Sequence, residues 1–404
     1  MITRPVTMER RVSMKVNLDP QPKFMINAFL VMFIIHTSQT GVGIAGLPRI
    51  VFMEAGRDAW ISVLLSGFSI SLVLFIMVAI LKSYESADLY GIHRDVYGKW
   101  LSVFFNCVYV VYLLCVTFII MMNYIEMVQA WIFPKIQPWL VMGLLLILLA
   151  YGVSGGFRVV AGICFLGFIF AFWLVFMIYT PVKFMSFNHL LPVMTASPDE
   201  LMKGIYKSSF SMVGFELLFV YYPYIKEKKK VLKFALIGSG YTTILFTVLT
   251  VVSIGFFSQE TLMKTIWPIL SMFKILRIPN LERFEFIAVS FWMLIILPNI
   301  CTYFWSAIRG MKRTFNVSHK KSIIIFCLAI WLISIFLDNR VLINTITDRI
   351  ATGSFVLAFI YPFILFALVK IRMRLTKRGV ARENSLYPLL LPPLSYRMSR
   401  DQVP

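Results

Sequence analysis

The chain has 404 residues, of which 59% are hydrophobic and only 14% are charged, and its mean hydropathy is +0.81. About a quarter of the residues of a soluble globular protein are charged, so this composition excludes a soluble enzyme or a soluble binding domain. The net charge of +20 could indicate a nucleic-acid-binding protein, but the basic residues are spread over short loops between long apolar segments. We therefore exclude nucleic acid as a partner and take the lipid bilayer as one.

Ten apolar segments follow one another along the chain. A helix needs about 20 apolar residues to cross a bilayer, and most of the segments approach or exceed this length. We predict an all-α membrane protein with ten transmembrane helices. In chain order the spans are Phe24–Met53, Trp60–Leu81, Leu101–Ile125, Trp139–Val153, Val159–Thr180, Lys203–Ile225, Phe234–Phe257, Phe286–Ile308, Ser322–Leu337 and Ile350–Val369.

The basic residues predict the topology. Most of the 39 Lys and Arg residues fall in the two tails and in the loop after every second span. By the positive-inside rule, both termini then lie in the cytoplasm. We expect a cytoplasmic tail over residues 1–23, a ten-span membrane domain over 24–371, and a basic, Pro-containing cytoplasmic tail over 372–404 without a fold of its own. The KEKKK cluster at 226–230 is interpreted as a topology signal that faces anionic lipid.

Polar residues, glycines and a proline interrupt the first span, in the stretch HTSQTGVGIAGLPR at 36–49. GVGIAG at 41–46 matches the dinucleotide fingerprint G-x-G-x-x-G, but that fingerprint requires a βαβ unit, which a membrane helix cannot supply. We expect instead an unwound strip at 41–46 and a second half-helix that begins near Leu47, with Pro48 in its first turn. Irregular backbone at this depth is tolerated where it lines a cavity or is buried in protein. Close packing between helices is the alternative explanation for the glycines.

The sixth span is interrupted as well, by Gly214 and the acidic Glu216. The first and sixth of ten spans are equivalent in a five-plus-five repeat. Paired interruptions at corresponding places in two halves indicate the binding site of an inverted-repeat transporter. The candidate ligand-binding residues lie at these two interruptions: Gly41, Val42, Gly43, Ile44, Gly46, Gly214, Phe215 and Glu216.

This arrangement suits a small zwitterion. Free amides at the start of the second half-helix favour a carboxylate, because the positive end of the helix dipole lies there. Carbonyl groups near Gly214, together with Glu216, favour an ammonium group. Alternatively, Glu216 is a structural acid that bonds to unwound backbone. Residues 36–40 either form hydrogen bonds between helices or line a solvated path.

We expect no catalytic residue, metal site or cofactor, because no nucleophile–base set, metal-ligand spacing or phosphate loop is present. The five cysteines all fall inside apolar spans and are interpreted as small core residues. Glu126 is expected to be an interfacial anchor. Glu282 and Glu285, with Arg283, are expected to form an ion-pair lock at the outer end of the eighth span.

Three motifs resemble the B subunits of spore germinant receptors, in the spore permease branch of the amino acid–polyamine–organocation superfamily. They are G-x-G-x-x-x-L-P-R at 41–49, G-x-E at 214–216 followed by a proline and a Lys-rich loop, and E-R-F-E-x-x-x-x-x-x-W at 282–292. The resemblance covers roughly residues 15–374. It implies a LeuT-type fold with a five-plus-five inverted repeat and broken first and sixth helices.

The resemblance also implies a multi-pass protein of the spore inner membrane or cell membrane, with the A and C subunits of the receptor as partners and a small, amino-acid-like nutrient as ligand. Two functions stay open. The chain is either a receptor subunit in which nutrient binding triggers germination, or a proton- or sodium-coupled secondary transporter of amino acids or polyamines. A sodium site would use hydroxyl groups of the eighth span opposite the first span, for which Ser290 and Thr302 are the candidates.

Overall fold

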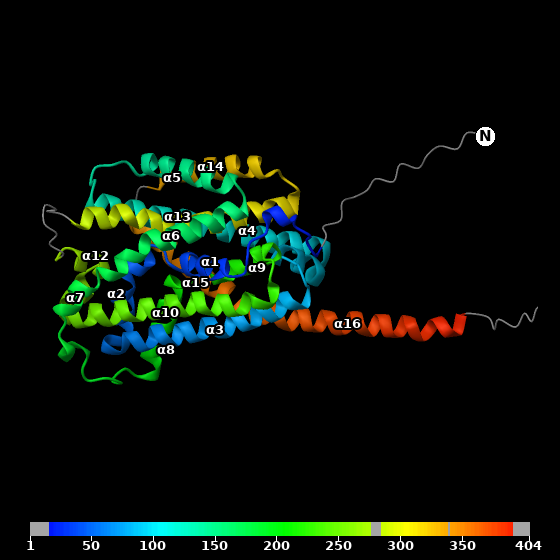
Figure 1. The fold of residues 1–404 in the computed structure, drawn as a ribbon, viewed down its shortest axis with the longest axis horizontal. Coiled ribbons are helices and arrows are strands. Elements are labelled where there is room, and N and C mark those ends of the chain that lie inside the picture. The colour runs from blue at the N-terminus through cyan, green and yellow to red at the C-terminus, as the bar shows by residue number, and fades with distance from the viewer. Residues whose placement is uncertain (1–15, 276–283, 338–339, 391–404) are drawn as a thin grey trace, which may run out of the picture.

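The computed structural model describes the backbone of residues 16–275, 284–337 and 340–390, and nearly all of it is helical. Figure 1 shows long helices packed side by side into one bundle. The α-helices are α1 (Leu30–Gln39), α2 (Gly43–Ala55), α3 (Ala59–Ser83), α4 (Leu89–Trp131), α5 (Pro138–Ser154), α6 (Phe157–Phe176), α7 (Tyr179–Lys183), α8 (Pro198–Ser211), α9 (Leu218–Tyr221), α10 (Val231–Phe256), α11 (Gln259–Lys264), α12 (Pro268–Phe273), α13 (Phe284–Phe315), α14 (His319–Phe336), α15 (Arg340–Phe355) and α16 (Tyr361–Leu390). Short 3-10 helices are η1 (Pro22–Phe24), η2 (Gly56–Asp58), η3 (Phe187–Leu190), η4 (Phe215–Leu217), η5 (Tyr222–Tyr224) and η6 (Lys228–Lys230), and η7 (Val356–Ile360) is a π-helix.

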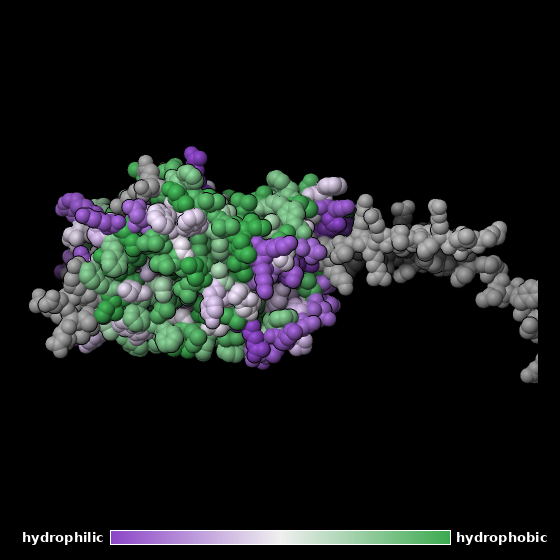
Figure 2. Space-filling view, turned by 90° about the horizontal axis from the view of Figure 1, so that it is seen from above, coloured by the Kyte–Doolittle hydropathy of each residue, from purple (hydrophilic) through white to green (hydrophobic). Residues whose placement is uncertain are grey.

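The bundle has the length and polarity of a membrane domain. Within the described residues, seven helices are long and apolar enough to cross a membrane. The other three predicted spans do not reach that length, because the first and sixth are divided into shorter helices and α5 has 17 residues. Figure 2 shows apolar side chains over the middle of the visible face and hydrophilic side chains toward both ends. The chain is thus an all-α, multi-pass membrane protein.

Several helices are apolar on every side, which suits helices that face lipid as well as protein. Phe68 on α3 is 73% exposed and Ile147 on α5 is 70% exposed, positions that water would penalise and hydrocarbon favours. The first span is enclosed instead: α1 packs against α6, α10 and α13, and α2 packs against α3 and α8. The interrupted helix therefore lies in the centre of the bundle.

The beginning of the first span is joined to the end of the sixth. The amide of Ile26 donates to the carbonyl of Tyr224 at 2.8 Å, and the amide of Lys226 donates back to the carbonyl of Ile26 at 3.0 Å. The amide of Ala28 donates to Oε2 of Glu227 at 2.7 Å. These bonds form an isolated parallel bridge between segments about 200 residues apart in the chain.

A buried carboxylate ties α4 to α13. Asp88 is the N-cap of α4, and its Oδ1 accepts a hydrogen bond from the amide of Gly91 at 2.8 Å. Its Oδ2 lies 3.0 Å from Nε of Arg313 and 4.0 Å from Nε of Arg309, while the Asp88 side chain is fully buried. A buried charge is costly unless it is paired, so the start of α4 can pack against α13 because these arginines pair with Asp88.

The described N-terminal residues and α16 lie at the same end of the bundle (Figure 1), as an even number of spans requires. α16 continues to Leu390 and projects beyond the other helices, so residues 372–390 are helical where we expected no regular structure. The division into domains at residues 23 and 371 stays a prediction. The predicted ion-pair lock involves Glu282 and Arg283, which lie outside the described residues.

Candidate ligand site at the two helix breaks

The break in the first span is shorter than predicted. α1 ends at Gln39 and α2 begins at Gly43, so only Thr40–Val42 separate the two helices. The predicted unwound strip over 41–46 and a helix start near Leu47 are therefore wrong. Pro48 lies in the second turn of α2 and not in its first turn.

The glycines of α2 permit close packing. A Cβ atom on Gly43 would lie 2.9 Å from Oγ of Ser211, and one on Gly46 would lie 3.2 Å from the carbonyl oxygen of Ile266. Both glycines have a helical backbone, so they allow close packing between helices, which was the alternative explanation for them. Gly41 lies within the break, where a Cβ would be 3.2 Å from Nδ2 of Asn299.

The predicted interruption of the sixth span is confirmed. α8 ends at Ser211, and the chain resumes as η4 at Phe215. Gly214 has φ +121°, a conformation that side chains with a Cβ rarely adopt. A Cβ on Gly214 would lie 2.1 Å from the carbonyl oxygen of Ser38, at the end of α1. The two breaks are thus in direct backbone contact, and a glycine is required for that contact.

Two amide side chains hold the breaks together. Nε2 of Gln39 donates to the carbonyl of Met212 at 2.9 Å, which links the first break to the second. Nδ2 of Asn299, on α13, donates to the carbonyl of Ser38 at 2.8 Å and approaches that of Thr40 at 3.4 Å. The carbonyls at the end of a helix have no partner within the helix, so these amides satisfy groups that the break exposes.

Glu216 is fully buried and binds three donors. Its Oε1 accepts hydrogen bonds from the hydroxyl groups of Tyr112 on α4 at 2.8 Å and Tyr303 on α13 at 3.0 Å. Its Oε2 accepts from the amide of Gly214 at 2.7 Å. The carboxylate thus connects the unwound backbone of the sixth span to two neighbouring helices, which matches the alternative in which Glu216 is a structural acid.

Three buried side-chain oxygens at the breaks have no hydrogen-bond partner within the described part of the chain: Ser38 Oγ, Gln39 Oε1 and Asn299 Oδ1. Buried polar atoms are normally paired, because an unpaired one costs about 1–3 kcal/mol. Carbonyl-type oxygens accept hydrogen bonds only, so two of the three require a donor. The centre of the bundle therefore offers acceptors to a group that carries N–H or O–H donors.

Asn299 and the two tyrosines that bind Glu216 were not among the predicted site residues. Asn299 follows Pro298 in the middle of an apolar span, and a polar residue at that depth is a signal that could have marked it. Nothing local in the sequence identifies Tyr112 or Tyr303, because the chain has 17 tyrosines and many of them lie in apolar spans.

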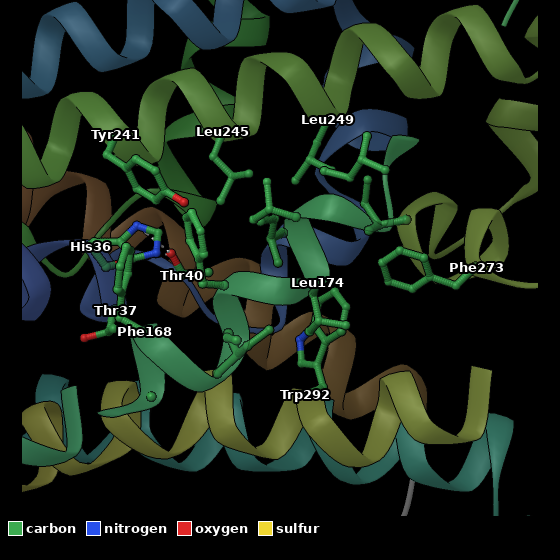
Figure 3. A pocket seen from close by; sticks show the side chains of 18 residues that line it. His36, Thr37, Thr40, Phe168, Leu174, Tyr241, Leu245, Leu249, Phe273 and Trp292 are labelled. Atoms are coloured by element: carbon green, nitrogen blue, oxygen red, sulfur yellow. Dashed lines mark hydrogen bonds between the residues drawn. The ribbon is translucent and has the colours of Figure 1, made fainter. Parts of the chain in front are cut away.

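A cavity of about 70 Å³ adjoins the first break. α1, α2, α6, α10, α12 and α13 contribute its walls, and Figure 3 shows His36, Thr37 and Thr40 at one end of it. Ile44 lines this cavity, whereas Gly214, Phe215 and Glu216 do not. The predicted residues are thus divided between the cavity and the packed contact of the two breaks.

The hydroxyl groups predicted for a sodium site do not meet. Ser290 is exposed on the surface of α13 and donates to the carbonyl of Phe286 at 2.9 Å, so that prediction is wrong for Ser290. Thr302 is buried, donates to the carbonyl of Pro298 at 2.8 Å and lies 3.5 Å from Sγ of Cys164. Across the described ranges, no group of three or more His, Cys, Asp and Glu side chains could hold a metal ion.

Two broken helices that meet in the centre of an all-α bundle define a protein of the LeuT type of transporter fold. The structure of a Na⁺-coupled sialic acid symporter in an outward-open, substrate-bound state matches with a TM-score of 0.62 and 12% identity, over 83% of this chain and 79% of that one. The structure of Mhp1, a nucleobase-cation-symport-1 family transporter, matches with a TM-score of 0.62 and 11% identity, over 85% and 79%. At such identities the likeness concerns the fold alone.

Sequence relatives identify the family. The family of spore germination proteins named Spore_permease matches residues 25–343. Spore germination protein GerQB of Bacillus cereus is 37% identical over 354 residues, which are 87% of this chain and 98% of that protein. The chain therefore belongs to this spore germination protein family, and the resemblance noted from the three motifs is confirmed.

Proposed function

We propose that the chain is the membrane subunit of a nutrient germinant receptor, and that a small, amino-acid-like nutrient binds at the two helix breaks and triggers germination. Membership of the spore germination family supports the process. The single observation that supports the site is the set of unpaired oxygens of Ser38, Gln39 and Asn299, buried where the two breaks touch. On this proposal the chain resides in the spore inner membrane with both termini in the cytoplasm, beside the A and C subunits.

In the proposed complex, the nutrient's ammonium group donates to the side-chain oxygens of Gln39 and Asn299. Its carboxylate faces the start of α2 at Gly43, where the helix dipole is positive. Gly41, Val42, Ile44 and Gly46 belong to the same half of the site. Glu216 acts by holding Gly214 and Phe215 in place, since its carboxylate is already bound by three donors.

Binding would add bonds from the ligand to the two side-chain amides that hold the breaks together. Asn299 holds the first break against α13, and Gln39 holds it against the second break. An ammonium group that binds the oxygens of both amides favours the arrangement of the two breaks and α13 in which both oxygens reach it. A ligand shifts such an equilibrium only by its difference in affinity for the two arrangements, so these contacts would provide the signal.

Substitution of the two amides tests the site. Spores that lack the gene are complemented with Gln39→Leu or Asn299→Leu chains, and germination is followed by loss of optical density over a concentration series of each amino acid. We expect the half-maximal nutrient concentration to rise at least about tenfold, because a hydrogen bond to a charged group contributes about 1.5–3 kcal/mol. Gln129→Leu is the matched control, since Gln129 also donates to a backbone carbonyl, that of Ile136 at 2.8 Å, but lies far from the breaks in α4. Normal potency of both variants at normal membrane abundance would refute the site.

A second candidate function is ion-coupled transport of the same nutrient, since the fold is shared with a Na⁺-coupled symporter and a nucleobase-cation symporter. Purified protein in liposomes with an imposed sodium or proton gradient distinguishes the two functions. Accumulation of labelled nutrient that follows the gradient would support transport. Saturable binding without accumulation would support the receptor.

A further inference from the structure

The cavity beside the first break has a buried inner wall and a more open mouth. Ile44, Phe273 and Trp292 belong to α2, α12 and α13, and they are almost fully buried. The lining residues that keep accessible surface come mainly from α6 and α10, among them Phe172, which is 40% exposed, and Leu245. The cavity therefore opens between α6 and α10.

That mouth faces the bilayer. The residues beside it on the same two helices are large, apolar and exposed, such as Ile169 at 47% and Ile244 at 63%. Both helices are long and apolar enough to span the membrane. Exposed apolar side chains on such helices contact hydrocarbon, so a molecule dissolved in the bilayer reaches the cavity directly.

The lining excludes a charged occupant. Among the described residues around the cavity, none is Asp, Glu, Lys or Arg. The hydroxyl groups of Thr37 and Thr40 donate to the carbonyls of Phe33 and His36, each at 2.8 Å, so neither is available as a donor. Ionised groups are costly in such surroundings unless paired, which leaves neutral, largely apolar molecules as the class that fits.

The indole N–H of Trp292, in the buried wall, has no acceptor among the described residues. Trp292 is 2% exposed, and its Nε1 has no hydrogen-bond partner among the described residues. Figure 3 shows its indole directed from α13 toward the cavity. A buried indole N–H normally finds a partner, so an occupant with a hydrogen-bond acceptor would remove this deficit. Trp292 is also the last residue of the third sequence motif, and no residue of that motif belongs to the proposed nutrient site.

We propose that this cavity is a lateral binding site for an uncharged lipophilic molecule with one hydrogen-bond acceptor. The molecule enters from the bilayer between α6 and α10 and accepts a hydrogen bond from the indole N–H of Trp292. Its volume of about 70 Å³ is several times the 10–15 Å³ that one water requires. Thr40 lies in the first break and Ile44 in the first turn of α2, and both line the cavity, so occupancy bears directly on the break. The site shares Ile44 with the proposed nutrient site, but its other lining residues differ and the proposal does not depend on nutrient binding.

Photoaffinity labelling in native membranes tests the proposal. The probe is a medium-chain methyl ketone with a diazirine and an alkyne, and the labelled peptides are identified by mass spectrometry. We expect labels on α6, α10 and α13 at the cavity. Leu245→Trp fills the cavity and should abolish them, whereas the control Ile244→Trp adds the same ring on the lipid-facing side of α10 and should preserve them. Ala171→Phe is a second filling variant, should Leu245→Trp fail to accumulate.

Competition tests the hydrogen bond. In the wild-type chain the unlabelled ketone should compete roughly threefold to tenfold better than an alkane of equal length, the ratio that one net hydrogen bond supplies. Trp292→Phe keeps the ring but removes the N–H, and it should equalise the two competitors. Labels that survive Leu245→Trp, or equal competition in the wild-type chain, would overturn the proposal, as would displacement of the probe by the nutrient alone. Labelling should also persist in Gln39→Leu, which separates this site from the proposed nutrient site.

Discussion

Replacing Gly214 with alanine should force the two helix breaks apart. The Cβ atom would lie 2.1 Å from the carbonyl oxygen of Ser38 and 2.4 Å from its carbonyl carbon, where real Cβ atoms essentially never come closer than 3.0 Å. Both are backbone atoms, so no side chain can rotate away. The breaks must therefore separate by about 1 Å to restore van der Waals contact.

Two costs follow from that separation. An alanine at φ +121° is strained by about 1–3 kcal/mol. A shift of about 1 Å also lengthens the 2.9 Å bond from Gln39 to the carbonyl of Met212 beyond hydrogen-bonding range, and a buried group left unpaired costs about 1–3 kcal/mol. Together they amount to roughly 2–6 kcal/mol, a large part of the 5–15 kcal/mol typical of folded proteins.

The assay is the apparent melting temperature of purified protein in nanodiscs, with membrane abundance measured by immunoblot. We expect Gly214→Ala to lower the melting temperature by roughly 2–7 °C, because a chain of 404 residues loses about 1 °C for each kcal/mol of stability, and to lower abundance. Gly240→Ala is the matched control, since Gly240 lies in α10 with nothing within 4 Å of its Cβ position. Alanine favours a helix over glycine by about 1 kcal/mol, so this control should be neutral or slightly stabilising.

An unchanged melting temperature for Gly214→Ala would refute the reasoning, because it would mean that the breaks do not need their close approach. A loss of stability as large in Gly240→Ala would refute it as well. In that case any added methyl group would explain the effect.

Three further outcomes are expected. Gly43→Ala should weaken the nutrient response because its Cβ would meet Oγ of Ser211 at 2.9 Å, and adding Ser211→Gly should restore it; a double variant as impaired as the single one would exclude crowding as the cause. Asp88→Asn should cost about 3–5 kcal/mol because it removes the negative charge from a buried ion pair with Arg313, and immunoblots of membranes should show its loss while Asp199→Asn, at an exposed surface pair, accumulates normally. Reporter fusions should place Lys229 and the C-terminus in the cytoplasm and Asp199 outside, and a cytoplasmic signal at Asp199 would break the ten-span topology.

The sequence allowed the broken helices to be predicted because glycines and a proline rarely interrupt a membrane span without a structural reason. It could not give the bounds of the first break. Gly43 and Gly46 are compatible with both helix and coil, and the approach of Ser211 and of residue 266 from other segments selects the helix. Pro48 in the second turn of α2 is compatible with this, since neighbouring groups in a protein interior satisfy freed carbonyls.

Local sequence patterns could not identify the side chains that form hydrogen bonds with the predicted residues. Glu216 was predicted as a candidate from its depth in the membrane, but Tyr112 lies 104 residues before it and Tyr303 lies 87 residues after it. Such contacts depend on how whole helices pack, which hydropathy does not encode. The same limit applies to Asn299, whose role becomes visible only when α13 is placed beside the first break.

The bridge between Ile26 and the end of the sixth span has a mechanical consequence. Its two backbone hydrogen bonds, and the bond from Ala28 to Glu227, would be lost if the segments parted. The first five residues after the sixth span are KEKKK, at 226–230, and Lys226 itself donates one of these bonds. Because these bonds join the segment before α1 to this loop, we expect a tilt of α1 to move the loop and its clustered positive charge at the surface of the bundle.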